Sequence, residues 1–255
     1  MQEGQVVVLS QKQREMQARE NLILDAAQDL LLRSGYFGLT MDRIAEASDC
    51  PKGTMYQSFT SKEDVVLALA CRSAEKRHAL MLRAIEFRGW PRERVIALGE
   101  AFALFSRLYP DDSRILHTAT GPIREKASRE RNAALARIEG MAVDVLLGIL
   151  NDAIDRGDLT LGNGATIEEM AFGIWALVEG GFTVIESDLP HSAFGIANPF
   201  SNVFRVFNVL ADGYGWRPLF AELDWEETLA QVRRTIFPQE AQRLYGEGEW
   251  HGDNA

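Results

Sequence analysis

Helical spacing of apolar residues recurs along nearly the whole chain and constrains the fold more than any other feature of the sequence. In its first clear example, apolar residues occupy positions 23, 26, 27, 30 and 31, which is the i, i+3, i+4, i+7, i+8 pattern of one helix face. No segment shows the convincing apolar–polar alternation of a half-buried strand. The sequence therefore predicts an all-α fold.

Capping and breaking residues divide this pattern into helices. Short helices are predicted at about 40–48 and 51–58, and a longer one begins at the capping-box pattern of Ser61 and ends before Pro91. Beyond Pro91 the predicted helices are 92–109, 112–120, 123–156 with a break near Ala127–Ser128, 166–187, 199–214 and 225–236. Loop 188–198 and tail 238–255 are rich in Gly, Pro, Asn and His, so we expect them to be flexible.

Composition excludes several classes of protein. The 255 residues are 46% hydrophobic, enough for one large or two smaller domains. No apolar run reaches the ~18 residues of a membrane span, and the N-terminus lacks a signal-peptide pattern. Cys50 and Cys71 cannot make a disulfide framework. We expect a cytoplasmic protein with no membrane contact, no metal and no cofactor.

The formal net charge of -10 is distributed unevenly. Residues 11–78 hold ten basic and ten acidic side chains, so the acidic excess lies in the C-terminal two-thirds. A neutral segment can still bind phosphate when its basic groups and helix N-termini face one way. The charge pattern is therefore compatible with a nucleic-acid-binding module near the N-terminus.

Residues 19–67 contain many spaced motif positions. These are Gly35-Tyr36, Thr40, Ile44-Ala45, Lys52-Gly53-Thr54-Met55-Tyr56, Phe59 and Ser61-Lys62-Glu63. Together they resemble the N-terminal DNA-binding domain of the TetR family of bacterial repressors, over about a fifth of the chain. The resemblance implies a helix-turn-helix domain at 1–70, a helical ligand-binding and dimerisation domain at 71–237, and a flexible tail at 238–255. It implies a repressor that binds a palindromic operator in double-stranded DNA as a dimer and is released by a small-molecule effector.

The helix at 51–58 would enter the major groove as the reading helix of this domain. Gly53 keeps its leading face small, and Gln57 can pair with adenine. Met55 and Phe59, on the other side, would anchor it to the core. The candidate DNA contacts are Thr40, Lys52, Gly53, Thr54, Tyr56, Gln57 and Lys62.

Four residues depart from the family pattern. Asp49 stands in the turn where glycine is usual, although aspartate tolerates the left-handed conformation. Pro51 replaces the usual capping serine, Gln57 a common histidine, and Ser58 a frequent aromatic residue. The last two lie on the expected reading surface, so no known operator sequence can be transferred to this chain.

The C-terminal part offers bulky apolar residues and a few polar ones within apolar helices. Each could be ordinary core or a solvated position, but together they could line a cavity for a small, largely apolar effector. The candidates are Phe102, Phe105, His117, Met141, Trp175 and Glu179. Helices 166–187 and 199–214 are apolar on more than one face, which favours a homodimer interface.

The sequence leaves two alternative functions. An enzyme is disfavoured, since no catalytic motif occurs and only Asp188, His191 and Ser192 lie close together, in a loop. The other alternative is a helical protein that binds a small molecule or a partner and whose helix-turn-helix has lost DNA affinity. The segment 216–255 suggests an extra helix and a tail of no evident role.

Overall fold

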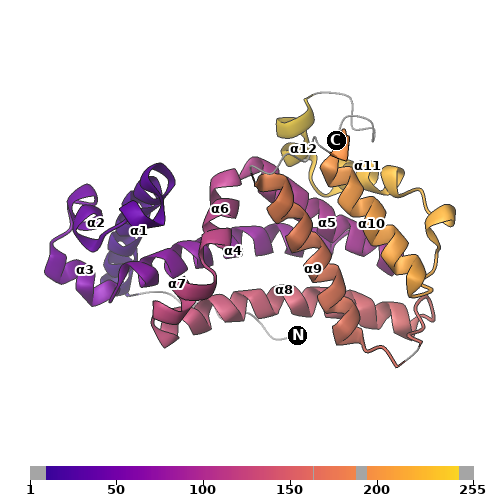
Figure 1. Cartoon of the computed structure of the whole chain (residues 1–255), viewed down its shortest axis with the longest axis horizontal. Helices are drawn as coiled ribbons and strands as arrows, with labels where there is room; N and C mark the ends of the chain where they lie inside the picture. Colours follow the sequence, from indigo (N-terminus) through magenta and orange to yellow (C-terminus); the bar gives the residue numbers. More distant parts are fainter. Residues whose placement is uncertain (1–9, 163, 188–193, 247–255) are drawn as a thin grey trace. The chain divides into compact units, whose positions relative to one another are not determined.

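The computed structural model describes residues 10–162, 164–187 and 194–246, and all regular structure within them is helical, which confirms the all-α prediction (Figure 1). The chain divides into two units. The first comprises residues 1–72 and 118–135, and the second residues 73–117 and 136–255. The first unit therefore includes a segment far along the chain, which the predicted boundary near residue 70 did not anticipate.

The first unit is built on α1 (Gln11–Gly38), α2 (Met41–Ala47) and α3 (Lys52–Ser58) (Figure 1). It also contains the start of α4 (Lys62–Ala84), α7 (Gly121–Lys126) and the start of α8 (Arg129–Asp155). Its core is made of large apolar side chains that are fully buried, namely Ile23, Leu39, Ile44, Met55 and Phe59. Met55 and Phe59 thus anchor α3 to the core as predicted.

The turn between α2 and α3 has the expected conformation. Asp49 has a φ of 49°, in the left-handed region, and Cys50 beside it is buried and donates its backbone N–H to the carbonyl of Ala45 at 3.1 Å. At the other end of α2, Thr40 Oγ1 accepts a hydrogen bond from Arg43 N at 3.2 Å. This N-cap fixes where α2 begins.

The segment around the α7–α8 break is hydrogen-bonded to α1, α3 and α4. Ser128 N donates to Asp64 Oδ1 at 2.7 Å, and Arg131 Nη2 donates to Glu20 Oε1 at 2.7 Å and to the carbonyl of Ser58 at 3.2 Å. Burial of Asp64 works against its charge, but hydrogen bonds from Thr60 and Ser128 keep the pKa of its carboxyl below the ordinary value. The predicted break at Ala127–Ser128 is confirmed, and it places these donors.

The second unit continues α4 and α8 and adds the remaining helices (Figure 1). These are α5 (Pro91–Leu108), α6 (Pro110–Thr118), α9 (Ile167–Glu186), α10 (Pro199–Gly213), α11 (Trp225–Thr235) and α12 (Pro238–Tyr245), with a short 3-10 turn η2 (Phe220–Glu222). α10 packs on α9, while α11 and α12 pack on α5. The core lies between these helices.

The expected tail begins with a helix. Residues 238–245 form α12, because Ala241 and the preceding Phe237 are fully buried and give the segment an apolar anchor. The other predicted flexible parts fall partly outside the description: residues 188–193, which include the Asp188, His191 and Ser192 group, and residues 247–255 are not described.

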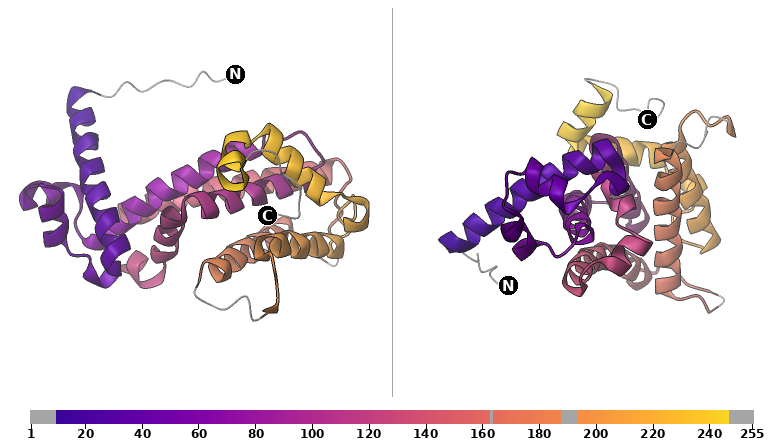
Figure 2. Two further views of the ribbon diagram at one scale, coloured as in Figure 1. Left: turned by 90° about the horizontal axis from the view of Figure 1, so that it is seen from above. Right: turned by 60° about the vertical axis from the view of Figure 1, so that its left-hand side comes forward.

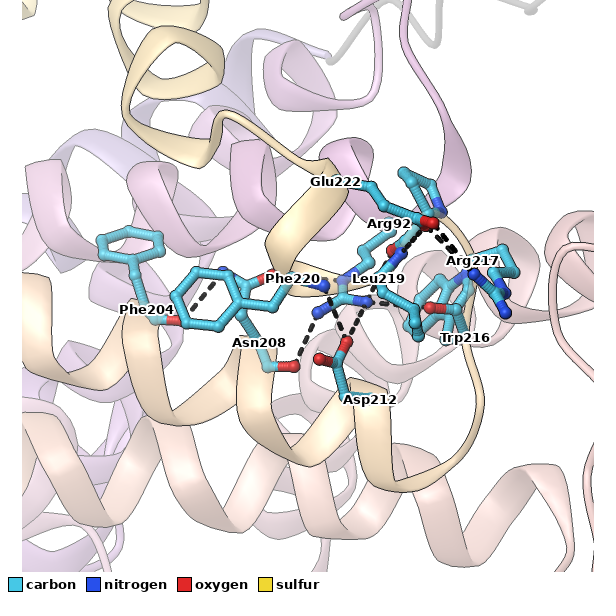
Figure 3. A network of polar contacts seen from close by, with 10 residues as sticks. Arg92, Phe204, Asn208, Asp212, Trp216, Arg217, Leu219, Phe220 and Glu222 are labelled. Carbon is cyan, nitrogen blue, oxygen red and sulfur yellow. Dashed lines mark hydrogen bonds and ion pairs between the residues drawn. The ribbon is translucent and has the colours of Figure 1, made fainter.

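A buried arginine joins the segment after α10 to α5 (Figure 3). The Arg92 side chain is fully buried, and it donates to Asp212 Oδ1 at 2.7 Å and to the carbonyl oxygens of Trp216 at 2.8 Å and Pro218 at 2.6 Å. Burial lowers the pKa of Arg92, which the bond to Asp212 partly offsets. A buried charge is tolerated only with such partners, so this network fixes the path of the chain toward α11.

Two ion pairs attach α11 and α12 to the rest of the unit. Arg233 Nε donates to Glu100 Oε1 at 2.7 Å, and both side chains are buried. Arg83, near the end of α4, is paired with Glu240 of α12 and donates to the carbonyl of Ile236 at 2.7 Å. The C-terminal extension is therefore an integral part of the second unit.

Candidate functional site

The exposed face of α3 is the first candidate site. Tyr56 is 49% exposed and Gln57 is also exposed, whereas the neighbouring Met55 is fully buried. A Cβ added at Gly53 would meet no other heavy atom within 4 Å. Within the described protein, a side chain at position 53 would therefore clash with nothing. Any need for glycine here would come from a molecule that binds this face of α3.

Lys52, at the start of α3, is paired within the protein. Its Nζ lies 2.7 Å from Asp42 Oδ1 of α2, and both side chains are well exposed. The hydrogen bond and charge of Asp42 raise the pKa of Lys52, so its ammonium stays charged. A phosphate contact by Lys52 would have to replace this exposed and weak ion pair.

Lys62 is bound more firmly. Its Nζ donates to the carbonyl of Tyr36 at 3.1 Å and lies 4.0 Å from the centre of the Tyr36 ring. The Tyr36 hydroxyl donates to Glu63 Oε1 at 2.5 Å, and burial together with Glu63 raises the pKa of Tyr36 to about 12. Lys62 thus joins α4 to the end of α1, and its role as a DNA contact stays a prediction.

The second candidate site is an apolar cavity in the second unit. Its volume is about 50 Å³, and α4, α5, α8, α9 and α10 contribute to its wall. Of the residues predicted to hold an effector, Phe102, Trp175 and Glu179 line this cavity, and the Phe102 and Trp175 rings meet edge to face at 6.2 Å. Glu179 is the one charged residue among those lining it.

Glu179 is held by an arginine that the sequence analysis did not single out. Arg77 Nη1, on α4, donates to Glu179 Oε1 at 2.8 Å, and its guanidinium lies 4.9 Å from the Phe102 ring centre and 5.8 Å from that of Trp175. The Arg77 side chain is only 11% exposed. Its charge and the acidic Glu179 were both visible in the sequence, but they are 102 positions apart and share no local pattern.

The other three predicted pocket residues lie elsewhere. Phe105 is buried in the core, with its ring 6.0 Å from Tyr109, and Met141 is exposed. His117 lies beside Glu186, with Nδ1 3.4 Å from Glu186 Oε2, and Ser113 Oγ donates to the other oxygen of Glu186 at 2.8 Å. None of the three lines the apolar cavity.

Close helix approach at two glycines shapes this cavity, and sequence reasoning missed both. A Cβ at Gly99 of α5 would lie 2.7 Å from Phe204 Cε1, and one at Gly181 of α9 would lie 2.8 Å from Val203 Cγ2 of α10. Gly99, Val203 and Phe204 all line the cavity. A glycine within a helix that also shows apolar periodicity was the only available signal.

Two features are absent from the described residues. No helix there combines the length and the hydropathy needed to cross a bilayer. Nor does any group of three or more His, Cys, Asp or Glu side chains in this part of the chain have the arrangement of a metal site.

A short exposed helix on a three-helix platform, followed by a helical unit with an apolar cavity, defines the class of helix-turn-helix proteins with a helical second domain. Residues 23–69 match the family described as bacterial regulatory proteins, tetR family. The N-terminal segment is therefore a DNA-binding domain of the tetR-family type, as the motif at 19–67 predicted. A curated relative is YvkB of Bacillus subtilis (strain 168), an uncharacterized HTH-type transcriptional regulator, 32% identical over 66 residues. The match spans 26% of this chain and about a third (35%) of the relative.

Solved structures extend the likeness to about three quarters of the chain. FadR of Bacillus subtilis, a transcriptional regulator determined with stearoyl-CoA, has a TM-score of 0.58 and 18% identity, covering 76% of this chain and 98% of its own. AibR, determined with isovaleryl coenzyme A and operator DNA, has a TM-score of 0.54 and 20% identity, covering 75% of this chain and 97% of its own. At these identities the likeness establishes the fold alone.

Proposed function

We propose that this chain is a one-component transcriptional repressor that binds a palindromic operator as a homodimer and is released by a small, largely apolar effector. The observation that carries the proposal is the face of α3, where Tyr56 and Gln57 are exposed on a helix whose other side is fixed in the core. A rigid, polar, outward-facing helix of this kind suits the major groove. The operator DNA bound by AibR, which has the same fold, supports this role.

Dimerisation is supported by the helices α9 and α10. Phe172 of α9 is 73% exposed and Val209 of α10 is 59% exposed, and Val184 and Val206 are also exposed. Apolar side chains gathered on two adjacent helices favour burial against a second copy. A single seven-residue α3 is also a small contact, which two copies on neighbouring half-sites would double.

An apolar effector is supported by the cavity wall. Its aromatic and aliphatic lining suits a chain or ring compound, and FadR and AibR, with the same fold, hold acyl-CoA ligands. The present volume of about 50 Å³ is well below the roughly 300–1,000 Å³ of small-molecule sites. The described conformation would therefore have to open to admit an effector, and its binding would favour the opened state.

The Arg77–Glu179 ion pair offers a route from effector to α4. Arg77 belongs to α4, a helix with residues in both units, whereas Glu179 belongs to α9. A ligand that hydrogen-bonds Glu179 or displaces the Phe102 ring would weaken the hold of α9 on α4. The ligand can shift the equilibrium only by its difference in affinity for the two states.

The test is selection of binding sites from a library of random duplexes, followed by affinity measurement on the enriched duplex. We expect a two-fold symmetric site. Tyr56→Ala and Gln57→Ala should lower affinity and relax the base preference, with the fold and the dimer unchanged. Glu46→Gln, at an exposed position of α2, is the matched control.

Two results would contradict the proposal. One is a folded dimer that enriches no sequence at low salt, which would favour the alternative of a ligand- or partner-binding protein without DNA affinity. The other is a protein that remains a monomer in sedimentation at concentrations well above those of the binding assay.

A further inference from the structure

The α1 arm, defined as residues 11–19, is a helical segment that the core of its own unit does not use. Every residue of the arm is exposed, and the buried face of α1 begins only at Ile23. Figure 2 shows this end of α1 projecting beyond α2 and α3. A helix that is polar nearly all round needs either a partner or special local support.

Local interactions set the helical start of the arm. Ser10 Oγ accepts a hydrogen bond from Gln13 N at 3.3 Å, and Gln13 Oε1 accepts one from Ser10 N at 2.8 Å, which is a capping box. Gln11 Nε2 also donates to Glu15 Oε1 one turn later, at 3.1 Å. Because unsupported helices this short are marginal in water, these devices maintain a conformation that packing does not.

The arm is also positively charged. It carries Lys12, Arg14 and Arg19 against a single carboxylate, Glu15. Among the described residues none of the three cations has an ion-pair partner, whereas the next carboxylate along the helix, Glu20, is bound to Arg131 at 2.7 Å. Exposed, unpaired cations on a helix are complementary to a phosphate backbone.

The base of the arm lies beside the N-terminal end of α3. Arg19 and Leu22 line an open groove together with Pro51 and Thr54. In helix-turn-helix domains the N-terminal residues of the reading helix contact the bases. From Gln11 to Arg19 the helix rises about 12 Å, similar to the ~12 Å width of the major groove. The cations of the arm can therefore reach backbone beside the groove that α3 enters.

We propose that the α1 arm is a second DNA contact, in which Lys12, Arg14 and Arg19 bind phosphates that flank the groove read by α3. The inference rests on the proposed function of α3. Phosphate contacts carry no base information, so the arm strengthens binding to every duplex alike and fixes the register of α3.

The experiment compares the salt dependence of three full-length proteins on two duplexes, the enriched site and a 40-base-pair random sequence. The arm variant is Lys12→Gln with Arg14→Gln and Arg19→Gln. The matched control, Arg33→Gln with Arg217→Gln and Arg234→Gln, removes the same charge from exposed positions outside the arm. Circular dichroism and sedimentation check that both variants keep the helical content and assembly of the wild type.

Each cation that contacts a phosphate contributes about 0.9 to the slope of log K against log salt concentration. We expect the slope of the arm variant to be shallower by about 1 to 3 per protomer on both duplexes. With all three contacts, the wild type would lose about 40-fold more affinity per protomer than the arm variant between 50 and 200 mM salt. The ratio of affinities for the two duplexes should not change.

The two proposals fail differently. If the wild type binds the enriched site but the arm variant has the same salt slope as the matched control, the role of the arm is overturned and the proposed function is left intact. A change in base preference without a change in slope also overturns it. If the wild type binds neither duplex, both proposals are overturned.

Discussion

The substitution Gly53→Ala should affect DNA affinity and fold stability in opposite directions, so it tests how closely DNA approaches α3. Gly53 lies in the first turn of α3, and a Cβ there meets no heavy atom within 4 Å. Alanine is favoured over glycine by about 1 kcal/mol in a helix interior, and we expect about half of this in a first turn. For a chain of this length the melting temperature should rise by about 1–2 °C.

The same methyl group should weaken DNA binding, because it would occupy the space where the backbone of α3 comes nearest to the duplex. Loss of one good base contact costs about 1–3 kcal/mol, or roughly 5- to 150-fold in affinity per protomer. Fluorescence anisotropy on the enriched duplex at fixed salt measures the affinity, and urea unfolding measures the stability. Gly140→Ala is the control: Gly140 is also helical and exposed, with open space around its Cβ, but lies in α8.

An unchanged affinity in a Gly53→Ala protein at least as stable as the wild type would refute the reasoning that the start of α3 approaches DNA closely. A lower stability would instead contradict the open surroundings of this glycine. Gly140→Ala should be more stable than the wild type and bind DNA equally well. A loss of DNA affinity in this control would show that added helical rigidity, rather than the position of the methyl group, affects binding.

Three further predictions concern the fold that supports the two sites. Gly99→Ala should lower the free energy of unfolding by about 1–3 kcal/mol, because its Cβ would lie 2.7 Å from a ring carbon of Phe204, whereas Gly148→Ala, with open space, should raise it; urea unfolding decides, and equal effects would contradict the close approach. Glu100→Gln should lower the free energy of unfolding by about 3–5 kcal/mol, because it leaves the buried Arg233 without its counter-charge. The apolar double variant, Glu100→Leu with Arg233→Met, should cost less. A calorimetric scan in which the double variant melts at a lower temperature than Glu100→Gln would contradict this. Asp64→Asn should destabilise the protein at pH 7 and much less at pH 3. A carboxyl whose pKa is lowered by folding stabilises the fold above its unfolded pKa of about 3.9, and this stabilisation is lost as the pH falls through the folded pKa. A difference in unfolding free energy that does not change with pH would show that the carboxylate charge is not the cause.

Much of the DNA-reading part could be predicted from the sequence because its signals are local. Capping residues such as Thr40, the apolar spacing that buries Met55 and Phe59, and the tolerance of Asp49 for a positive φ each act within a few residues. The helix boundaries were also close, including the break at Ala127–Ser128. The sequence did not predict the exposed helical segment 11–19 at the start of α1. Its polar residues show no apolar periodicity, and its capping box is not followed directly by buried residues.

The tertiary structure alone decided which distant residues meet. Glu179 could be suspected from its place in an apolar helix, but its partner Arg77 lies on α4, and no periodicity connects the two. His117 looked equally suspect and lies beside Glu186 instead. The candidate pocket residues share one chemistry, and only packing determines which of them face the cavity.

Sequence by itself determined the all-α fold, the helix-turn-helix and the position of α3, because hydrogen bonds and caps within a helix depend on neighbours along the chain. Only the tertiary structure brought residues 118–135 into the first unit and made 238–245 a helix. Those outcomes depend on partly buried contacts between distant parts of the chain, such as Ser128 with Asp64 and Glu240 with Arg83. Such contacts form only when folding brings the two partners together, and each partner then offsets part of the cost of removing the other from water.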